Sequence, residues 1–184
     1  ESIDETAARE LAEETNLHDI YMEQLYTFGD VKRDPRMRVI SVSYIALVPK
    51  EKLIFEAGDD AADINLFTLD FTAEGNIEFY NNENTIKLTQ DDIAFDHIKV
   101  IKMGIERLRG KLKYTDIAFD LLNNKKAFTI YELQKIYEAI NGYKEETANF
   151  RRSFLRRYVK TGDVIELNEK STQFSRRASM MYCK

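Results

Sequence analysis

The sequence has little cysteine, little histidine and no long apolar run, and each shortage excludes a class of protein. Its one cysteine, Cys183, has no partner in the chain, which excludes a disulfide framework and favours a reducing cytoplasm. The two histidines, His18 and His97, are too few and too far apart to suggest zinc, so any bound metal is expected to be a hard cation held by carboxylates. No stretch approaches roughly 18 apolar residues, so no membrane span and no membrane partner are expected.

The charge of the chain is unevenly spread. Its 184 residues carry a net charge of −5, but residues 145–184 alone contain nine basic and five acidic residues. The tail is therefore net +4, and residues 1–144 are net −9. An acidic body with a basic tail indicates two units with different partners, and we predict domains at residues 1–112 and 113–184.

The pattern of apolar residues predicts an α+β protein. Residues 20–28, 37–48 and 63–69 are predicted strands, and residues 72–92 contain hairpin candidates. A helix is expected from about residue 91 to Gly110, followed by three helical segments at 116–122, 130–141 and 145–159. Two short strands, 164–167 and 178–182, complete the chain. Three helices followed by a β-hairpin are typical of a winged helix.

The first helix, predicted over residues 4–15, carries an acidic flank. Glu10, Glu13 and Glu14 are spaced i, i+3 and i+4, so they share one side of the helix. Carboxylates this close repel one another, and an ordinary solvated surface is one interpretation of them. The other is a cleft in which Mg²⁺ or Mn²⁺ is bound by these carboxylates and by diphosphate oxygens.

The wider pattern around this flank resembles the Nudix box. Glu1 lies eight residues before Arg9-Glu10-Leu11, which is followed at the family's spacing by Glu13-Glu14 and then by Asn16-Leu17. The resemblance implies an α/β/α sandwich that cleaves nucleoside diphosphate derivatives. It also implies that Glu10, Glu13 and Glu14 are catalytic metal ligands and that the catalytic Arg9 orients them.

The chain departs from the Nudix pattern in two ways. Asn16 replaces the last glycine of the box, which is a mild change because asparagine also tolerates the left-handed backbone at a helix end. The opening glycine of the box would precede Glu1, as would the family's first strands. We therefore expect the sequence to be an N-terminally incomplete Nudix-type domain.

A basic loop between the first two strands provides candidate substrate-binding residues. Arg33, Arg36 and Arg38 precede a Val-Ile-Ser-Val strand, as in Nudix proteins that act on ligands similar to ADP-ribose. Guanidinium groups pair well with diphosphate oxygens. The alternative, a solvated turn, weighs about equally.

The helix at 145–159 provides candidate DNA-binding residues. Phe150, Phe154 and Tyr158 recur every four residues and form an apolar stripe, while polar side chains lie on the opposite face. The predicted DNA contacts are Asn149, Arg152 and Arg156 on that face and Arg176 and Arg177 in the wing. A solvated basic face is the alternative interpretation.

The second half of the chain resembles the Nudix-related transcriptional regulators. The segments that carry this likeness include Ala94-Phe95-Asp96-His97, Phe128-Thr129-Ile130-Tyr131 and Asn149-Phe150-Arg151-Arg152. The resemblance implies a nucleotide-sugar ligand such as ADP-ribose, operator DNA and a homodimer. Two functions follow as expectations: a Mg²⁺-dependent Nudix pyrophosphohydrolase, with or without coupling to DNA binding, and a ligand-sensing repressor whose Nudix half does not hydrolyse. The surviving box favours the first, and the basic helix favours the second.

Overall fold

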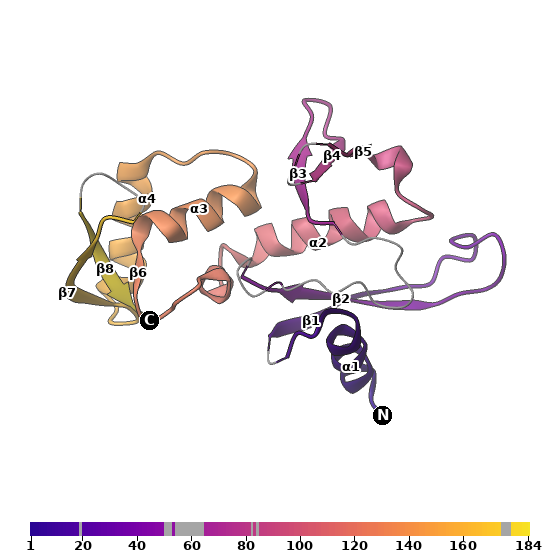
Figure 1. Ribbon diagram of the computed structural model, residues 1–184, viewed down its shortest axis with the longest axis horizontal. Coiled ribbons are helices and arrows are strands. Elements are labelled where there is room, and N and C mark those ends of the chain that lie inside the picture. Colours follow the sequence, from indigo (N-terminus) through magenta and orange to yellow (C-terminus); the bar gives the residue numbers. More distant parts are fainter. Residues whose placement is uncertain (19, 50–52, 54–64, 82, 84, 174–177) are drawn as a thin grey trace. The chain divides into compact units, whose positions relative to one another are not determined.

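The computed structural model describes the whole chain except residues 19, 50–52, 54–64, 82, 84 and 174–177, and it describes only the backbone of Glu14 (Figure 1). The chain divides into two compact units, Glu1–Arg107 and Leu108–Lys184. None of the described helices is long and apolar enough to cross a membrane.

The first helix, α1 (Ile3–Thr15), is fixed at both ends by local chemistry. Ser2 and Glu5 form a capping box: the Ser2 amide donates to Glu5 at 2.7 Å, and the Glu5 amide donates to the Ser2 hydroxyl at 3.2 Å. The helix ends at Asn16, whose φ of 54° is left-handed. The predicted helix and its asparagine end are thus confirmed.

A hairpin and a small sheet follow in the first unit. Strands β1 (Tyr21–Phe28) and β2 (Ser41–Leu47) pair antiparallel, with an irregularity between Gln24 and Tyr26. Strands β3 (Phe67–Phe71), β4 (Ile77–Asn81) and β5 (Lys87–Thr89) form a second antiparallel sheet in that order. Gly75, with φ of 81°, lies in the turn between β3 and β4, at the position where the sequence predicts a hairpin.

The long helix α2 (His97–Lys111) covers the β1–β2 hairpin. Its Gly104 lies against this hairpin, because a Cβ added there would be 3.7 Å from Ile45 and 3.9 Å from Leu25. The Arg107 guanidinium donates to the Leu25 carbonyl at 3.1 Å. A short 3₁₀ turn, η2 (Gln90–Asp92), precedes this helix, so the helix starts later than the apolar spacing predicts.

The second unit has the predicted winged-helix order. A 3₁₀ segment, η3 (Ile117–Leu121), leads to β6 (Phe128–Thr129) and α3 (Ile130–Asn141). Helix α4 (Thr147–Phe154) continues as a π-helical segment, η4 (Leu155–Val159), and the wing is formed by β7 (Ile165–Ser171) and β8 (Ser179–Cys183). The sheet order is β6-β8-β7, all antiparallel (Figure 1).

Aromatic rings fill the core of this second unit. Phe119 meets Phe128 edge-on at 5.6 Å and Tyr158 at 5.0 Å between ring centroids, and Phe154 meets Tyr182 at 5.2 Å. Phe128 and Tyr182 are fully buried. The apolar stripe predicted for the helix at 145–159 therefore packs inward and leaves the opposite face of that helix to solvent.

Candidate functional site

The Arg9 guanidinium forms ion pairs with three carboxylates on and just before α1. Its Nη2 lies 2.8 Å from Glu10, its Nη1 lies 2.9 Å from Glu13 and its Nε lies 3.2 Å from Glu1. Hydrogen bonding to these carboxylates, to Glu1 above all, raises the pKa of Arg9. These four side chains are 43–60% exposed. The structure thus brings Arg9, Glu10 and Glu13 together, while the side chain of Glu14 lies outside the described residues.

The described side chains do not form a metal site by themselves. Glu10 and Glu13 each use one carboxylate oxygen in an ion pair with Arg9. Across the described part of the chain, no group of three or more His, Cys, Asp or Glu residues is placed to hold a metal ion. The assignment of Glu10, Glu13 and Glu14 as metal ligands remains a prediction.

Arg33, a predicted substrate residue, is engaged inside the first unit. Its Nε and Nη2 each donate to one oxygen of Asp96 at 3.0 Å, and only 7% of the Arg33 side chain is exposed. Hydrogen bonding to Arg33 lowers the pKa of Asp96. The third nitrogen, Nη1, is buried without a hydrogen-bond partner. Arg33 therefore ties the basic loop to the start of α2.

The other two predicted substrate arginines are closer to solvent. Arg36 pairs with Asp34 through two hydrogen bonds, of 3.0 and 2.8 Å, and is 71% exposed. Its guanidinium carbon lies 5.1 Å from the centroid of the Phe95 ring. Arg38 donates to the Gly29 carbonyl at 2.6 Å. Arg36 and Arg38 are thus both exposed, and Arg36 is paired with a carboxylate.

A cavity of about 230 Å³ lies beside these arginines. Its lining includes Arg33, Arg36, Ser41, Phe95 and His97. Phe95 holds a left-handed backbone with φ of 51°, and its ring is 53% exposed. The sequence signals neither the cavity nor the Arg33–Asp96 pair, because the two partners are 63 positions apart in the chain.

Helix α4 presents the face predicted to bind DNA. The Glu146 side chain caps the helix by accepting from the amides of Ala148 and Asn149 at 3.0 and 2.9 Å. Phe150 and Phe154 are buried beneath the helix. Three predicted DNA-binding side chains are exposed: Asn149, Arg152 and Arg156.

The guanidinium of Arg152 donates to the side-chain oxygen of Asn149. This bond holds two of the predicted base-reading groups next to each other on the exposed side of α4. The two remaining predicted DNA-binding residues, Arg176 and Arg177, lie outside the described residues.

A second cavity, of about 480 Å³, lies between α3, α4 and the two strands of the wing. Arg151 and Lys170 line it, together with Gln134 and Tyr182. Sequence reasoning missed this cavity because its walls come from four separate elements. The hydrophobic periodicity of each element indicates which face is buried but not how the elements meet.

The two parts of the chain match two known domain families. Residues 1–83 match the NUDIX domain family. Residues 118–183 match the family described as the NrtR DNA-binding winged helix domain.

Two curated relatives are similar in sequence. The ADPR responsive transcriptional repressor NtrR of Acinetobacter baylyi is 30% identical over 176 residues, which cover 96% of this chain and 61% of that protein. The ADP-ribose pyrophosphatase of Methanocaldococcus jannaschii is 35% identical over 102 residues, which cover 55% of this chain and 48% of the relative. The chain thus spans less than two thirds of the length of either protein.

Two solved structures are similar along the whole chain. Shewanella oneidensis NrtR complexed with a 27mer DNA has a TM-score of 0.69 and 27% identity, and 73% of its chain is covered. A MutT/nudix family protein from Enterococcus faecalis has a TM-score of 0.69 and 29% identity, and 70% of its chain is covered. Both alignments cover 100% of the present chain.

Proposed function

We propose a function from the premise that this chain is a Nudix domain joined to an NrtR-type DNA-binding winged helix domain, as in the Nudix-related transcriptional regulators. It is a transcriptional repressor that binds operator DNA through the winged helix and responds to a nucleotide-sugar ligand of the ADP-ribose type. The observation that carries this proposal is that α4 and η4 are anchored by buried aromatic rings and leave Asn149 and Arg152 of α4 and Arg156 of η4 exposed to solvent. The similarity to NrtR complexed with DNA supports it.

The exposed face of α4 has the chemistry needed to read bases. A guanidinium can bind guanine through two hydrogen bonds, and an asparagine amide can do the same with adenine. The bond between Arg152 and Asn149 orders both side chains before DNA arrives. A homodimer would place two copies of α4 in successive turns of the major groove, which implies a palindromic operator.

The ligand side of the proposal rests on the first unit. A ligand similar to ADP-ribose carries a diphosphate, and the exposed Arg36 lies beside the 230 Å³ cavity, where it can pair with phosphate oxygens. Arg33 lines the same cavity but is held by Asp96, so its role is to shape the wall rather than to move toward the ligand. The 30% identity to a repressor described as ADPR responsive supports this choice of ligand.

DNA binding is tested with Arg152→Ala on an operator selected by the full-length protein from random DNA. We expect affinity to fall by about 1–3 kcal/mol, with relaxed preference at one base position, because the lost contact is to a base. Lys126→Ala is the matched control, because Lys126 is an exposed cation of the same unit that lies in a turn before β6 and not on α4. Operator affinity equal to that of the wild-type protein would refute α4 as the reading helix.

Hydrolysis is a second candidate function, favoured by the cluster of Arg9, Glu10 and Glu13 and by the similarity to an ADP-ribose pyrophosphatase. It would require Glu10, Glu13 and Glu14 to hold Mg²⁺ or Mn²⁺ beside the diphosphate. ADP-ribose hydrolysis with Mg²⁺ is compared between the wild-type protein and its Glu13→Gln and Glu14→Gln variants. Equal rates in all three proteins exclude this function and leave the repressor proposal intact.

A further inference from the structure

A short connector, residues 112–116, leads from α2 into the winged-helix unit. Helix α2 starts in the first unit and ends at Lys111 in the second. Leu112 is buried, and the Thr115 amide donates to the Lys111 carbonyl at 2.8 Å. The connector continues directly into η3, whose Phe119 belongs to the aromatic core. The connector thus lies in the second unit and links η3 to α2, the helix that contains the boundary between the two units.

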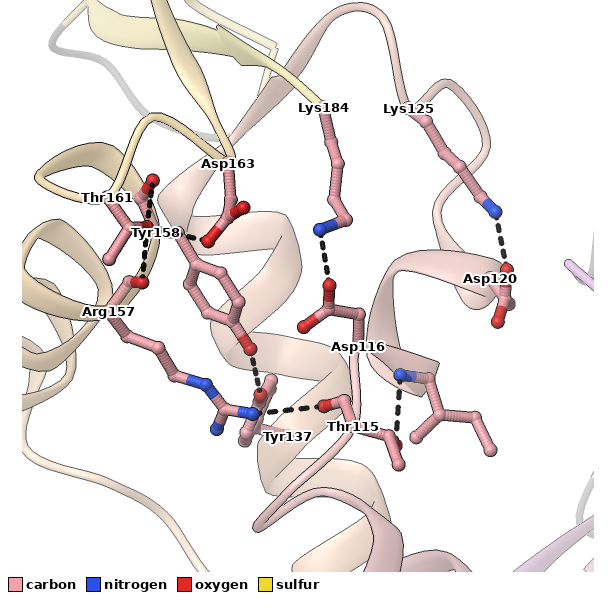
Figure 2. A network of polar contacts seen from close by, with 11 residues as sticks. Thr115, Asp116, Asp120, Lys125, Tyr137, Arg157, Tyr158, Thr161, Asp163 and Lys184 are labelled. Carbon is pink, nitrogen blue, oxygen red and sulfur yellow. Dashed lines mark hydrogen bonds and ion pairs between the residues drawn. The ribbon is translucent and has the colours of Figure 1, made fainter.

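Arg157 lies in η4, which directly follows the proposed reading helix α4, and it forms hydrogen bonds with this connector. Its Nη1 donates to the Leu112 carbonyl at 3.3 Å, and its Nη2 donates to the Thr115 carbonyl at 3.2 Å. Figure 2 shows the guanidinium extended toward Thr115, with Tyr158 and Tyr137 beside it. Because the two carbonyls are three residues apart, one planar guanidinium can reach both, whereas a lysine ammonium has only one nitrogen to offer.

The π-helical segment η4 fixes the backbone that carries Arg157. The Lys160 amide donates to the Leu155 carbonyl at 2.9 Å, which is the five-residue step of a π-turn. Such turns are rare and often mark functional positions in helices. Next to Arg157, the buried Tyr158 hydroxyl lies 3.2 Å from the Tyr137 hydroxyl of α3, and burial raises the pKa of Tyr158 (Figure 2).

Neighbouring arginines on this segment therefore serve different surfaces. Arg156 is exposed, as are Asn149 and Arg152, whereas Arg157 is half-buried and its guanidinium bonds to the connector. The basic run that predicts DNA contacts thus contains one half-buried arginine, which donates to two backbone carbonyls.

We propose that Arg157 is a positioning residue for DNA recognition, which clasps the connector to the reading helix so that displacement of the connector reorients Asn149 and Arg152. This inference rests on the proposed repressor function. It supplies the route by which ligand binding in the first unit reaches the DNA-reading surface. The physical basis is that both carbonyls held by Arg157 belong to the segment that directly follows α2, the helix in which the first unit ends and the second begins.

A second tether on the same connector provides a matched control. The Lys184 ammonium contacts the Asp116 carboxylate (Figure 2). The Lys184 amide donates to the Lys125 carbonyl at 2.9 Å. Lys184→Gln removes the first contact and keeps the second, because the second belongs to the backbone. This variant loosens the connector from the residue that follows β8 and removes the ammonium from the Phe119 and Tyr158 rings, but it leaves both hydrogen-bonding partners of Arg157 in place.

The first experiment measures binding of the selected operator and of scrambled DNA by full-length Arg157→Gln. We expect operator affinity to fall about tenfold, the factor of roughly one lost charge-assisted hydrogen bond, with scrambled DNA bound as before. The salt dependence of operator binding stays unchanged, since a phosphate contact would reduce its slope by about 1. Added ADP-ribose shifts the operator affinity of the variant less than that of the wild-type protein.

Two further variants test whether the loss of operator affinity comes from the Arg157 hydrogen bonds. Lys184→Gln keeps the operator affinity and the ADP-ribose response of the wild-type protein. Arg157→Lys keeps the positive charge but loses the planar pair of donor nitrogens. Its operator affinity should therefore lie between those of Arg157→Gln and the wild-type protein. Full recovery by Arg157→Lys, an unchanged Arg157→Gln or a slope reduced by about 1 would each overturn the proposal.

Hydrogen exchange tests the clasp without DNA or ligand. In Arg157→Gln, amides of residues 112–116 and 147–159 exchange faster together, whereas in Lys184→Gln only residues 112–116 do so. Faster exchange throughout residues 108–184 would show general destabilisation and overturn the proposal. A wild-type protein that does not distinguish operator from scrambled DNA refutes the repressor function instead, and the exchange pattern still decides whether the clasp exists.

Discussion

The two units of this chain bury their apolar side chains very differently. Of the eighteen buried hydrophobic residues among those described, thirteen belong to residues 108–184 and five to the longer first unit. Large exposed apolar side chains show the reverse, with nine in the first unit and four in the second. The winged-helix unit thus has a dense core of its own, whereas the described part of the Nudix unit leaves much apolar surface exposed.

The difference shows how each unit holds its functional groups. In the winged helix, aromatic rings anchor α4 from below, so its outer face is placed by packing. In the Nudix unit, polar pairs such as Arg33–Asp96 and Arg9–Glu13 position the candidate groups. A site placed by packing is sensitive to lost volume, and a site placed by ion pairs is sensitive to charge and pH.

The largest expected contrast comes from truncating one apolar side chain in each unit. Phe128→Ala should destabilise the second unit by about 3–5 kcal/mol, because Phe128 is fully buried among aromatic rings. Leu69→Ala in β3, where the side chain is 37% exposed, should cost less than about 1 kcal/mol. Urea unfolding followed by hydrogen exchange of each unit measures both changes. Equal losses would contradict the difference in core density.

An intermediate effect is expected from two capping boxes of the same type, one exposed and one buried. Thr129 exchanges hydrogen bonds of 2.7 to 3.3 Å with Glu132 at the start of α3, and Thr129 itself is buried. Thr129→Ala should cost about 1–2 kcal/mol. Ser2→Ala breaks the same box in α1, where water can replace the lost bonds, so its cost should be smaller. Thermal denaturation of both variants compares them, and a larger loss for Ser2→Ala would reverse the expected order.

The smallest effect concerns the charges of the Nudix unit. Hydrogen bonds from Arg36 lower the pKa of Asp34 to about 2 from its ordinary value of 3.8. The stability contributed by this depressed pKa is therefore present above pH 3.8 and is lost as the pH falls toward 2. Titration by NMR should show Asp34 still ionised at about pH 3. In Arg36→Gln its pKa should return toward the ordinary value, and no change would contradict the pairing.

Local patterns predicted most of the elements. The asparagine end of α1 and the aromatic stripe predicted for residues 145–159 depend only on neighbours in sequence, and both are confirmed. Strand β6 was missed because two residues carry no periodicity, and its place is set by pairing with β8. The end of the last helix was predicted as regular helix, but it is a π-segment.

The candidate sites show which contacts local sequence patterns cannot predict. Shared helical spacing is enough to place Arg9, Glu10 and Glu13 together. The partners of Arg33 and Arg157 depend on tertiary structure, since Asp96 and the Leu112 carbonyl are 63 and 45 positions away in sequence. Each of these arginines appears in the sequence as part of a basic run, and only the fold distinguishes those that are engaged inside the protein from those left exposed.

The left-handed backbone of Phe95 lowers the stability of the fold but places the aromatic ring next to Arg36. A side chain with a Cβ in this conformation costs about 1–2 kcal/mol, which glycine or asparagine would largely avoid. Either replacement would relax the chain just ahead of α2 and remove the aromatic surface beneath the Arg36 guanidinium. Selection for heat resistance alone would therefore favour losing this ring, whereas screens that also require occupancy of the neighbouring cavity would retain it.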